Sequence, residues 1–243
     1  MNDKKEKEKL YLNFLLKYLQ YDYSEIKNPN DNPDFKLIIN NKKIGIELTR
    51  IFDTTGKPTL MEIESEHEKI ADKLLKLFNK AVLPKIDINI SFVPSRPLLS
   101  KIDHQKYAWQ LFDIILTHFP TNNSFLIVND PHILPKIIVA IRVARYDFIE
   151  INSIATTKFG FVIKDFQTSL QKILDKKHKK INGYDKTCNE FWLLVYSDGS
   201  SGAAMFQPTI DTIEYKYTSK FKRVFYISNM NPNKIYELNL VQI

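Results

Sequence analysis

The segment from Asn32 to Thr49 constrains the fold of this chain more than any other, because it predicts a β-hairpin with one apolar and one acidic face. The first strand, Phe35–Ile39, follows Pro33-Asp34, and proline is tolerated where a strand begins. A polar turn cluster at 40–43 separates it from a second apolar run at 44–49. Two short antiparallel strands are therefore expected near the N-terminus.

The register of this hairpin decides where its two acids lie. Asparagine tolerates the positive φ that a two-residue turn needs, so a loop at 40–41 would put Asp34 directly opposite Glu47, with β-carbons about 5 Å apart. A loop at 41–42 would instead put Asp34 opposite Thr49, with Glu47 one diagonal step away on the same face. In both registers the other face is apolar and is predicted to be core: Phe35, Leu37, Ile39, Ile44 and Ile46.

Two carboxylates this close repel each other unless a proton or a cation lies between them. A hard divalent ion with oxygen ligands, such as Mg²⁺, suits the position, and the backbone carbonyl of Leu48 could complete the ligand set with Asp34 and Glu47. The alternative is an ordinary edge hairpin whose acids face solvent.

Composition narrows the class of protein. The chain has 243 residues and an apolar fraction of 44%, enough for one large domain or two small ones. No apolar run approaches the ~20 residues that cross a bilayer, and the N-terminus lacks the apolar core of a signal peptide. With one cysteine, Cys188, and no zinc-ligand spacing, we expect a cytoplasmic protein without a membrane partner. The formal charge of +7 is compatible with nucleic-acid binding, although it also fits an AT-rich genome.

Periodicity predicts alternating helices and strands, and hence an α/β or α+β protein whose sheet is covered on both faces. No repeat or linker divides the chain, so a single domain over 1–243 is favoured. Residues 21–32 read as a polar loop. The expected helices cover 7–21, 60–80, 103–118 and 166–184, and the expected strands after the hairpin cover 86–93, 125–128, 137–143, 148–151, 159–162, 190–196, 223–227 and 235–240.

Lys177 stands out in the helix over 166–184. It lies at helical spacing from Leu174 and Ile181, on the face that the apolar residues define. A lysine on a buried face is costly unless it is paired with an acid or belongs to a site. The alternative is that its ammonium group snorkels to the surface.

Pro33-Asp34 followed by Glu47-x-Thr49 resembles the PD-(D/E)xK signature of restriction endonuclease-like nucleases. The order of helix, acid-bearing hairpin, helix and strand is similar over about 7–93, and the sheet and helix of about 120–243 fit more loosely. The resemblance implies a restriction endonuclease-like mixed central sheet and an endonuclease dependent on Mg²⁺ or Mn²⁺. It further implies DNA as the partner, pairing into a homodimer, and a role in restriction or phage defence.

The sequence departs from this signature at Thr49, where the family has a lysine that orients or activates the attacking water. Three outcomes are open: the lysine has moved, with Lys177 as the candidate; the metal acts alone; or the chain is an inactive scaffold that binds nucleic acid or protein. The resemblance also implies an acid from an early helix as a further metal ligand. Glu25 is the first choice, followed by Glu64 and Glu66, although surface or capping roles are the simpler interpretation of all three.

The C-terminal region offers a possible nucleic-acid surface. Basic residues there alternate with Tyr215, Tyr217 and Phe221, so bases could stack between phosphate contacts. The basic residues are Lys216, Lys220, Lys222 and Arg223. The five histidines show no paired ligand spacing and are expected at the surface.

Overall fold

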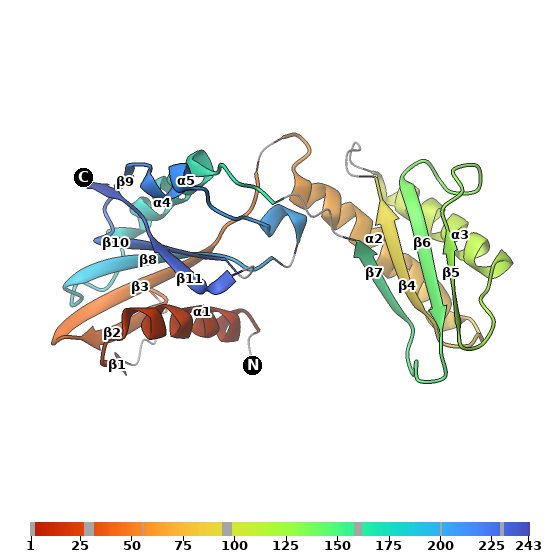
Figure 1. Ribbon diagram of the computed structural model, residues 1–243, viewed down its shortest axis with the longest axis horizontal. Helices are drawn as coiled ribbons and strands as arrows, with labels where there is room; N and C mark the ends of the chain where they lie inside the picture. The colour runs from red at the N-terminus through yellow and green to blue at the C-terminus, as the bar shows by residue number, and fades with distance from the viewer. Residues whose placement is uncertain are drawn as a thin grey trace. The chain divides into compact units, whose positions relative to one another are not determined.

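The computed structural model describes residues 3–26, 32–54, 56–93, 99–157, 162–199, 201–228 and 231–243. The chain forms two compact units (Figure 1): unit 1 comprises Met1–Asp53 and Gly160–Ile243, and unit 2 comprises the residues between them, Thr54–Phe159. Unit 2 is thus inserted between the two segments of unit 1. Compact units can still belong to one cooperatively folding domain, so the single domain favoured above stays a prediction.

A mixed sheet with strand order β1-β2-β3-β8-β10-β11 forms the centre of unit 1. Its strands are β1 (Tyr23–Ile26), β2 (Phe35–Ile39), β3 (Lys42–Arg50), β8 (Glu190–Ser197), β10 (Arg223–Ser228) and β11 (Asn231–Glu237). β1, β2 and β3 are antiparallel neighbours, whereas β8 runs parallel to both β3 and β10. Around the sheet lie α1 (Asp3–Leu19), α4 (Gln167–Ile181), the 3-10 turn η1 (Gly202–Ala204), α5 (Ile210–Glu214) and a small pair, β9 (Tyr217–Ser219) with β12 (Leu240–Gln242).

The hairpin has the first of the two predicted registers. Phe35 pairs with Ile46 and Ile39 pairs with Lys42, so the loop is Asn40-Asn41. Both asparagines have positive φ, 50° and 60°, as a tight two-residue turn requires. The predicted apolar face is confirmed, since all five of its residues are buried in one core cluster.

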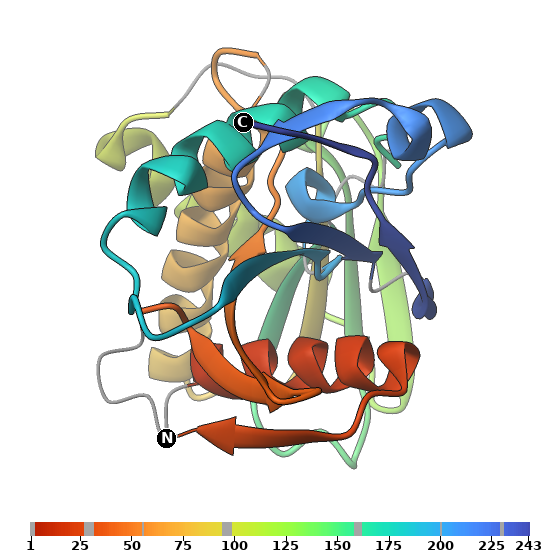
Figure 2. The ribbon, with the colours of Figure 1, turned by 90° about the vertical axis from the view of Figure 1, so that its left-hand side faces the viewer.

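The two faces of this sheet pack against different helices, as Figure 2 shows for α1 and α4. Alternate residues of β3 and β8 point to opposite sides, so Ile46 and Trp192 join α1 residues in one core, whereas Leu193 joins α4 residues in another. The α1 contacts come from Tyr11, Leu12, Leu15 and Leu16. Leu10 and Tyr18 of the same helix lie outside this core and are about half exposed.

Unit 2 has a four-stranded sheet with order β5-β6-β4-β7 in its described part. Its elements are α2 (Leu60–Lys80), β4 (Asp87–Phe92), α3 (Lys101–Thr117), β5 (Ser124–Val128), β6 (Ile138–Arg145) and β7 (Ser153–Thr157). α2, predicted to the residue, and α3 share a core with β4, β6 and the inward side of β5. Both helices begin with a capping box, at Thr59 and Ser100, which satisfies N–H groups of the first turn.

Several predicted strands need correction. Residues 148–151 form no strand, and β5 is an edge strand on which Phe125 and Ile127 are half exposed. The expected loop over 21–32 contains strand β1. Of the strand expected over 159–162, only Val162 lies within the described residues, outside any strand.

Candidate metal site at the open edge of strand β3

The candidate site forms where β3 extends beyond its neighbour β2. β2 begins at Phe35, opposite Ile46, so the last four residues of β3 have β8 on one side and no β2 partner on the other. Glu47 is the first of these four residues. It lies on the α4 face of the sheet and is only 5% exposed. Asp34 immediately precedes β2, so the hairpin brings its carboxylate to the same open edge.

Asp34 is fixed in this position by several contacts. Its Oδ2 accepts a hydrogen bond of 2.7 Å from the backbone N–H of Leu48. Lys5 Nζ on α1 donates to the backbone carbonyl of Asp34 at 3.0 Å. Gly45 allows the preceding Pro33 to pack against β3, because a β-carbon at position 45 would lie 2.7 Å from Pro33 Cγ. Gly45, two residues before Glu47, therefore leaves the space in which Pro33 packs, and this packing helps to position Asp34.

Lys177 reaches the same edge from α4. Its Nζ lies 2.6 Å from Glu47 Oε1 and 3.4 Å from the backbone oxygen of Leu48. The side chain is 13% exposed, so it points toward the acids and does not snorkel to the surface. Lys177 can lie on the apolar face of its helix because its ammonium group pairs with a buried acid, Glu47, 130 residues earlier in the sequence.

The carboxyl group of Asp34 is the acid at this edge whose ionisation is opposed most clearly. Burial raises the pKa of Asp34 to about 6, with the negative charges of Glu47 and Glu8 adding to the effect, while the Leu48 N–H and Lys177 act against it. Burial and the charge of Glu47 also raise the pKa of the nearby Tyr184 hydroxyl. Lys177 contacts Glu47, and Lys4 Nζ on α1 lies 3.4 Å from Glu8 Oε1. A further cation beside Asp34 would stabilise its ionised form, whose pKa burial and the neighbouring acids raise.

A pocket of about 430 Å³ opens beside these groups within unit 1. It is lined by Lys4, Lys7, Glu8, Leu48, Thr49, Arg50, Phe52, Lys177, Tyr196 and Asp198. Sequence reasoning missed Glu8, although a signal was present. Glu8 precedes Tyr11, Leu12 and Leu15 by three, four and seven residues, which places it on the buried face of α1, and it is 4% exposed.

The donor set fits a hard divalent cation. Two carboxylates and the Leu48 carbonyl are oxygen ligands of the kind that Mg²⁺ uses, and Mg²⁺ keeps several waters, so few protein ligands are needed. Two of these donors, Glu47 and the Leu48 carbonyl, already share one positive group, the Lys177 ammonium. In the described part of the chain, no group of three or more His, Cys, Asp or Glu residues is arranged to hold a metal ion. A site here would therefore rest on two side-chain carboxylates, the carbonyl and water.

Thr49 lines the pocket next to these groups, two residues after Glu47 on the same face of β3. Glu25 lies elsewhere. It pairs with Leu37 in the β1–β2 ladder, which puts it on the α1 face of the sheet, and its carboxylate is 3.6 Å from Lys9 Nζ with 47% of the side chain exposed. Glu25 is therefore not brought together with Asp34 and Glu47.

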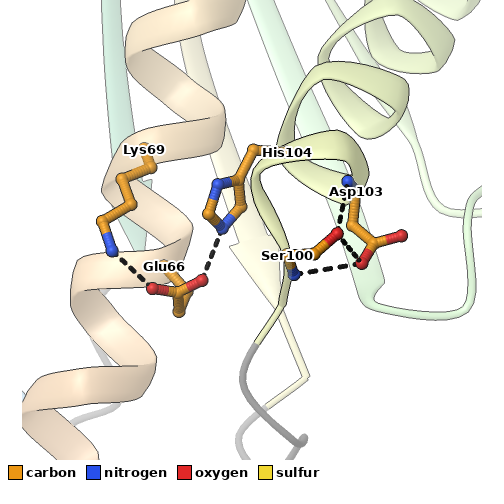
Figure 3. Close-up of polar contacts among 5 residues, drawn as sticks. All are labelled: Glu66, Lys69, Ser100, Asp103 and His104. Carbon is orange, nitrogen blue, oxygen red and sulfur yellow. Dashed lines mark hydrogen bonds and ion pairs between the residues drawn. The ribbon is translucent and has the colours of Figure 1, made fainter.

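Glu64 and Glu66 belong to α2 in unit 2, and both are buried. Glu66 Oε2 lies 2.5 Å from His104 Nε2 on α3, and Glu66 Oε1 lies 2.5 Å from Lys69 Nζ (Figure 3). His67, His104 and His178 are buried, so the expectation of surface histidines is wrong for these three.

The predicted stacking surface in the C-terminal region also needs correction. Tyr217 and Phe221 are fully buried in the α4-side core, and their rings are not available to bases. Tyr217 and Phe221 were predicted to be exposed because they alternate with lysines; instead they fill the space between α4 and the sheet.

Comparison with protein-family models, with curated proteins and with solved structures gave no match. Among the described helices, none combines the length and the apolar character that crossing a bilayer requires.

Proposed function

We propose that this protein is a metal-dependent nuclease that hydrolyses phosphodiester bonds, with DNA as the substrate. One observation carries the proposal: Asp34, Glu47, the Leu48 carbonyl and Lys177 meet at one open strand edge beside a pocket. They come from three separate parts of the sequence, and their net charge is negative. Structural ion pairs alone do not require the second acid, Asp34.

Each residue has a role in this proposal. Asp34, Glu47 and the Leu48 carbonyl hold Mg²⁺ or Mn²⁺. The bound ion supplies Lewis-acid stabilisation of the phosphate and lowers the pKa of a coordinated water. Lys177 neutralises charge that develops on the phosphate and, through its contact with Glu47, orients the water. The Leu48 N–H donates to Asp34 Oδ2 at 2.7 Å, which restrains the carboxylate at this strand edge.

The topology of unit 1 supports the restriction endonuclease-like interpretation. Helix, acid-bearing hairpin, helix and strand occur in unit 1 as α1, β2–β3, α4 and β8. The helix and strand that the sequence analysis assigned to this order, α2 and β4, lie in unit 2. With α4 as the second helix of this order, Lys177 supplies the positive charge that the family's lysine would provide. Thr49 at the usual position of that lysine then needs no charge.

The test is incubation of purified protein with supercoiled, linear and single-stranded DNA and with RNA, each in Mg²⁺, Mn²⁺ or EDTA. Asp34→Ala should abolish metal-dependent cleavage. Glu66→Gln is the matched control, because Glu66 is also a buried, ion-paired acid but lies in unit 2. The proposal is wrong if Asp34→Ala and Glu47→Ala, correctly folded, both cleave like the unmodified protein.

A second candidate is a scaffold that binds nucleic acid or protein without cleaving it. Thr49 favours it, and so does the contact of Lys177 with two of the proposed metal ligands, since an ammonium ion there replaces a metal in balancing Glu47. This function predicts metal-independent binding that survives Asp34→Ala. A melting temperature that Mg²⁺ raises in the unmodified protein but not in Asp34→Ala would count against it.

A further inference from the structure

Helix α4 carries an excess of positive charge on its solvent-exposed side. It contains five lysines and one acid, Asp175, whereas α2 in unit 2 contains four lysines and five acids. Lys177 points inward to Glu47 and does not belong to the exposed side. The other four lysines of α4 are exposed and follow one another at helical spacing: Lys172, Lys176, Lys179 and Lys180.

A second row of lysines lies on the segment 216–222. Alternate residues of this segment point inward, because Tyr217, Ser219 and Phe221 are fully buried. The remaining residues point outward, and three of those four are exposed lysines: Lys216, Lys220 and Lys222. Between 216 and 222 no aromatic ring is available to bases, so this row offers charge without stacking.

The two rows lie side by side, as Figure 1 shows for α4 and β9. Gln171 Nε2 donates to the Thr218 carbonyl at 3.0 Å, and the Thr218 N–H donates to Gln171 Oε1 at 3.0 Å. The Lys220 N–H donates to His178 Nε2 at 3.1 Å, about two helical turns further along α4. The seven lysines of the two rows therefore form one continuous exposed surface of unit 1, the lysine surface.

The acids in these segments do not cancel the charge of the lysine surface. Asp175 and Glu214 are the nearest in sequence, and counting both leaves a net charge of +5 (seven minus two). Residues 162–186 and 209–223 together hold eleven basic and five acidic residues, so the charge stays positive even when Asp34, Glu47 and Glu237 are subtracted as well (eleven minus eight). Within the described part of the chain, none of the seven lysines forms an ion pair with an acid. Lysines gathered in this way repel one another and attract a partner with dense negative charge.

We propose that the lysine surface binds the phosphate backbone of a nucleic-acid duplex. Duplex DNA carries about one negative charge per 1.7 Å of its axis, and its phosphates can be bound without any contact to the bases. The choice of nucleic acid among polyanions rests on the proposed function. Helix α4 connects the two, because its inner side presents Lys177 to Glu47 and its outer side carries four lysines of the surface.

The experiment measures binding in EDTA, so that metal-dependent cleavage does not interfere. Fluorescein-labelled DNA duplex, RNA duplex and single-stranded DNA are titrated with protein, and anisotropy is read at several salt concentrations. The double variant Lys172→Gln with Lys176→Gln should weaken duplex binding about tenfold. It should also make the slope of log K against log salt shallower by about two, since each phosphate contact contributes about 0.9.

The second row is tested by Lys220→Gln with Lys222→Gln, for which we expect the same two changes. Unchanged affinity and slope in both correctly folded double variants would overturn the proposal. Tighter binding of single-stranded DNA than of either duplex would overturn the assignment of a duplex as the partner.

The matched control lies on α2. Lys76 and Lys80 are exposed lysines four residues apart, as Lys172 and Lys176 are, but they belong to a helix of mixed charge. Lys76→Gln with Lys80→Gln should leave affinity within about twofold and the slope unchanged, because no phosphate contact is lost. An equal loss in this control would overturn the specific role of the lysine surface.

Further outcomes separate the lysine surface from the proposed function. Protein that binds duplex through these lysines but cleaves nothing in Mg²⁺ or Mn²⁺ would disprove the nuclease and leave the surface standing. Metal-dependent cleavage by a protein whose double variants bind like the unmodified chain would disprove the surface and leave the nuclease standing. Binding to phosphatidylserine-containing vesicles but to none of the nucleic acids would overturn the proposal in favour of a lipid partner.

Discussion

Each unit contains a buried carboxylate joined to a basic side chain of a neighbouring helix. In unit 1, Glu47 on β3 contacts Lys177 on α4, with 2.6 Å between Oε1 and Nζ. In unit 2, Glu66 on α2 contacts His104 on α3, with 2.5 Å between Oε2 and Nε2 (Figure 3). Judged by distance and burial, the two pairs are nearly equivalent.

The two pairs differ in the charged groups that surround them. Burial alone would raise the pKa of Glu66, but hydrogen bonds from Lys69 and His104 outweigh it and the pKa is lowered, so its charge is satisfied. Beside Glu47, the pKa of a second acid, Asp34, is raised to about 6. A buried ion pair in charge balance stabilises helix packing. One with an extra acid beside a pocket has the properties of a ligand site.

The largest expected contrast is in cleavage. Glu47→Gln should lower the rate about a thousandfold, because Lewis-acid stabilisation is worth several kcal/mol and 1.36 kcal/mol is tenfold in rate. Glu66→Gln should leave the rate unchanged. Single-turnover cleavage of the preferred substrate in Mg²⁺ measures both, and equal rates for the two variants would remove the functional distinction between the pairs.

At pH 7, substitutions of Asp34 and Glu66 should change the stability of the metal-free protein in opposite directions. Asp34→Asn removes the surplus charge and should stabilise the fold by about 1–2 kcal/mol, allowing for solvent screening. Glu66→Gln should destabilise by about 1–2 kcal/mol, because it weakens a satisfied buried pair. Urea unfolding in EDTA gives both values. Added Mg²⁺ should stabilise the unmodified protein and not Asp34→Asn; destabilisation by Asp34→Asn would show that the acids are already balanced.

The contributions of Asp34 in unit 1 and His67 in unit 2 to folding stability should also depend on pH in opposite directions. Asp34 has a raised pKa in the folded state, so its contribution to stability is present below its ordinary pKa of 3.8 and is lost as pH rises through about 6. Burial lowers the pKa of His67 in unit 2 from 6.5 to about 4, so its contribution is present above 6.5 and is lost as pH falls through about 4. Thermal unfolding from pH 4 to 8 in EDTA should show Asp34→Asn losing the first dependence and His67→Asn losing the second.

What the sequence could predict depended on the range of the interaction. Short-range turn rules placed Asp34 and Glu47 on one face of a hairpin and left two registers open, of which the structure has the one with the Asn40-Asn41 loop. Lys177 was found because a lysine on an apolar helical stripe needs a partner, although its identity came only from the fold. The insertion of unit 2 could not be predicted, because α2–β4 and α4–β8 are both a helix followed by a strand, and the long-range pairing of β3 with β8 decides which of them belongs to the hairpin's sheet.

The smallest expected effect concerns Glu25, which the sequence analysis suggested as a further metal ligand and which the structure does not bring together with Asp34 and Glu47. Glu25 makes an exposed contact with Lys9, at 3.6 Å, and surface pairs of this kind are worth about 0–1 kcal/mol. Glu25→Gln should therefore change neither cleavage nor stability measurably. Glu8→Gln removes a buried acid that lines the pocket and adds to the charge around Asp34, so it should lower Mg²⁺-dependent cleavage. Isothermal titration with Mg²⁺ should show weaker binding in Glu8→Gln only. Weaker Mg²⁺ binding in Glu25→Gln, with binding unchanged in Glu8→Gln, would show that the assignment of Glu8 to the site is wrong.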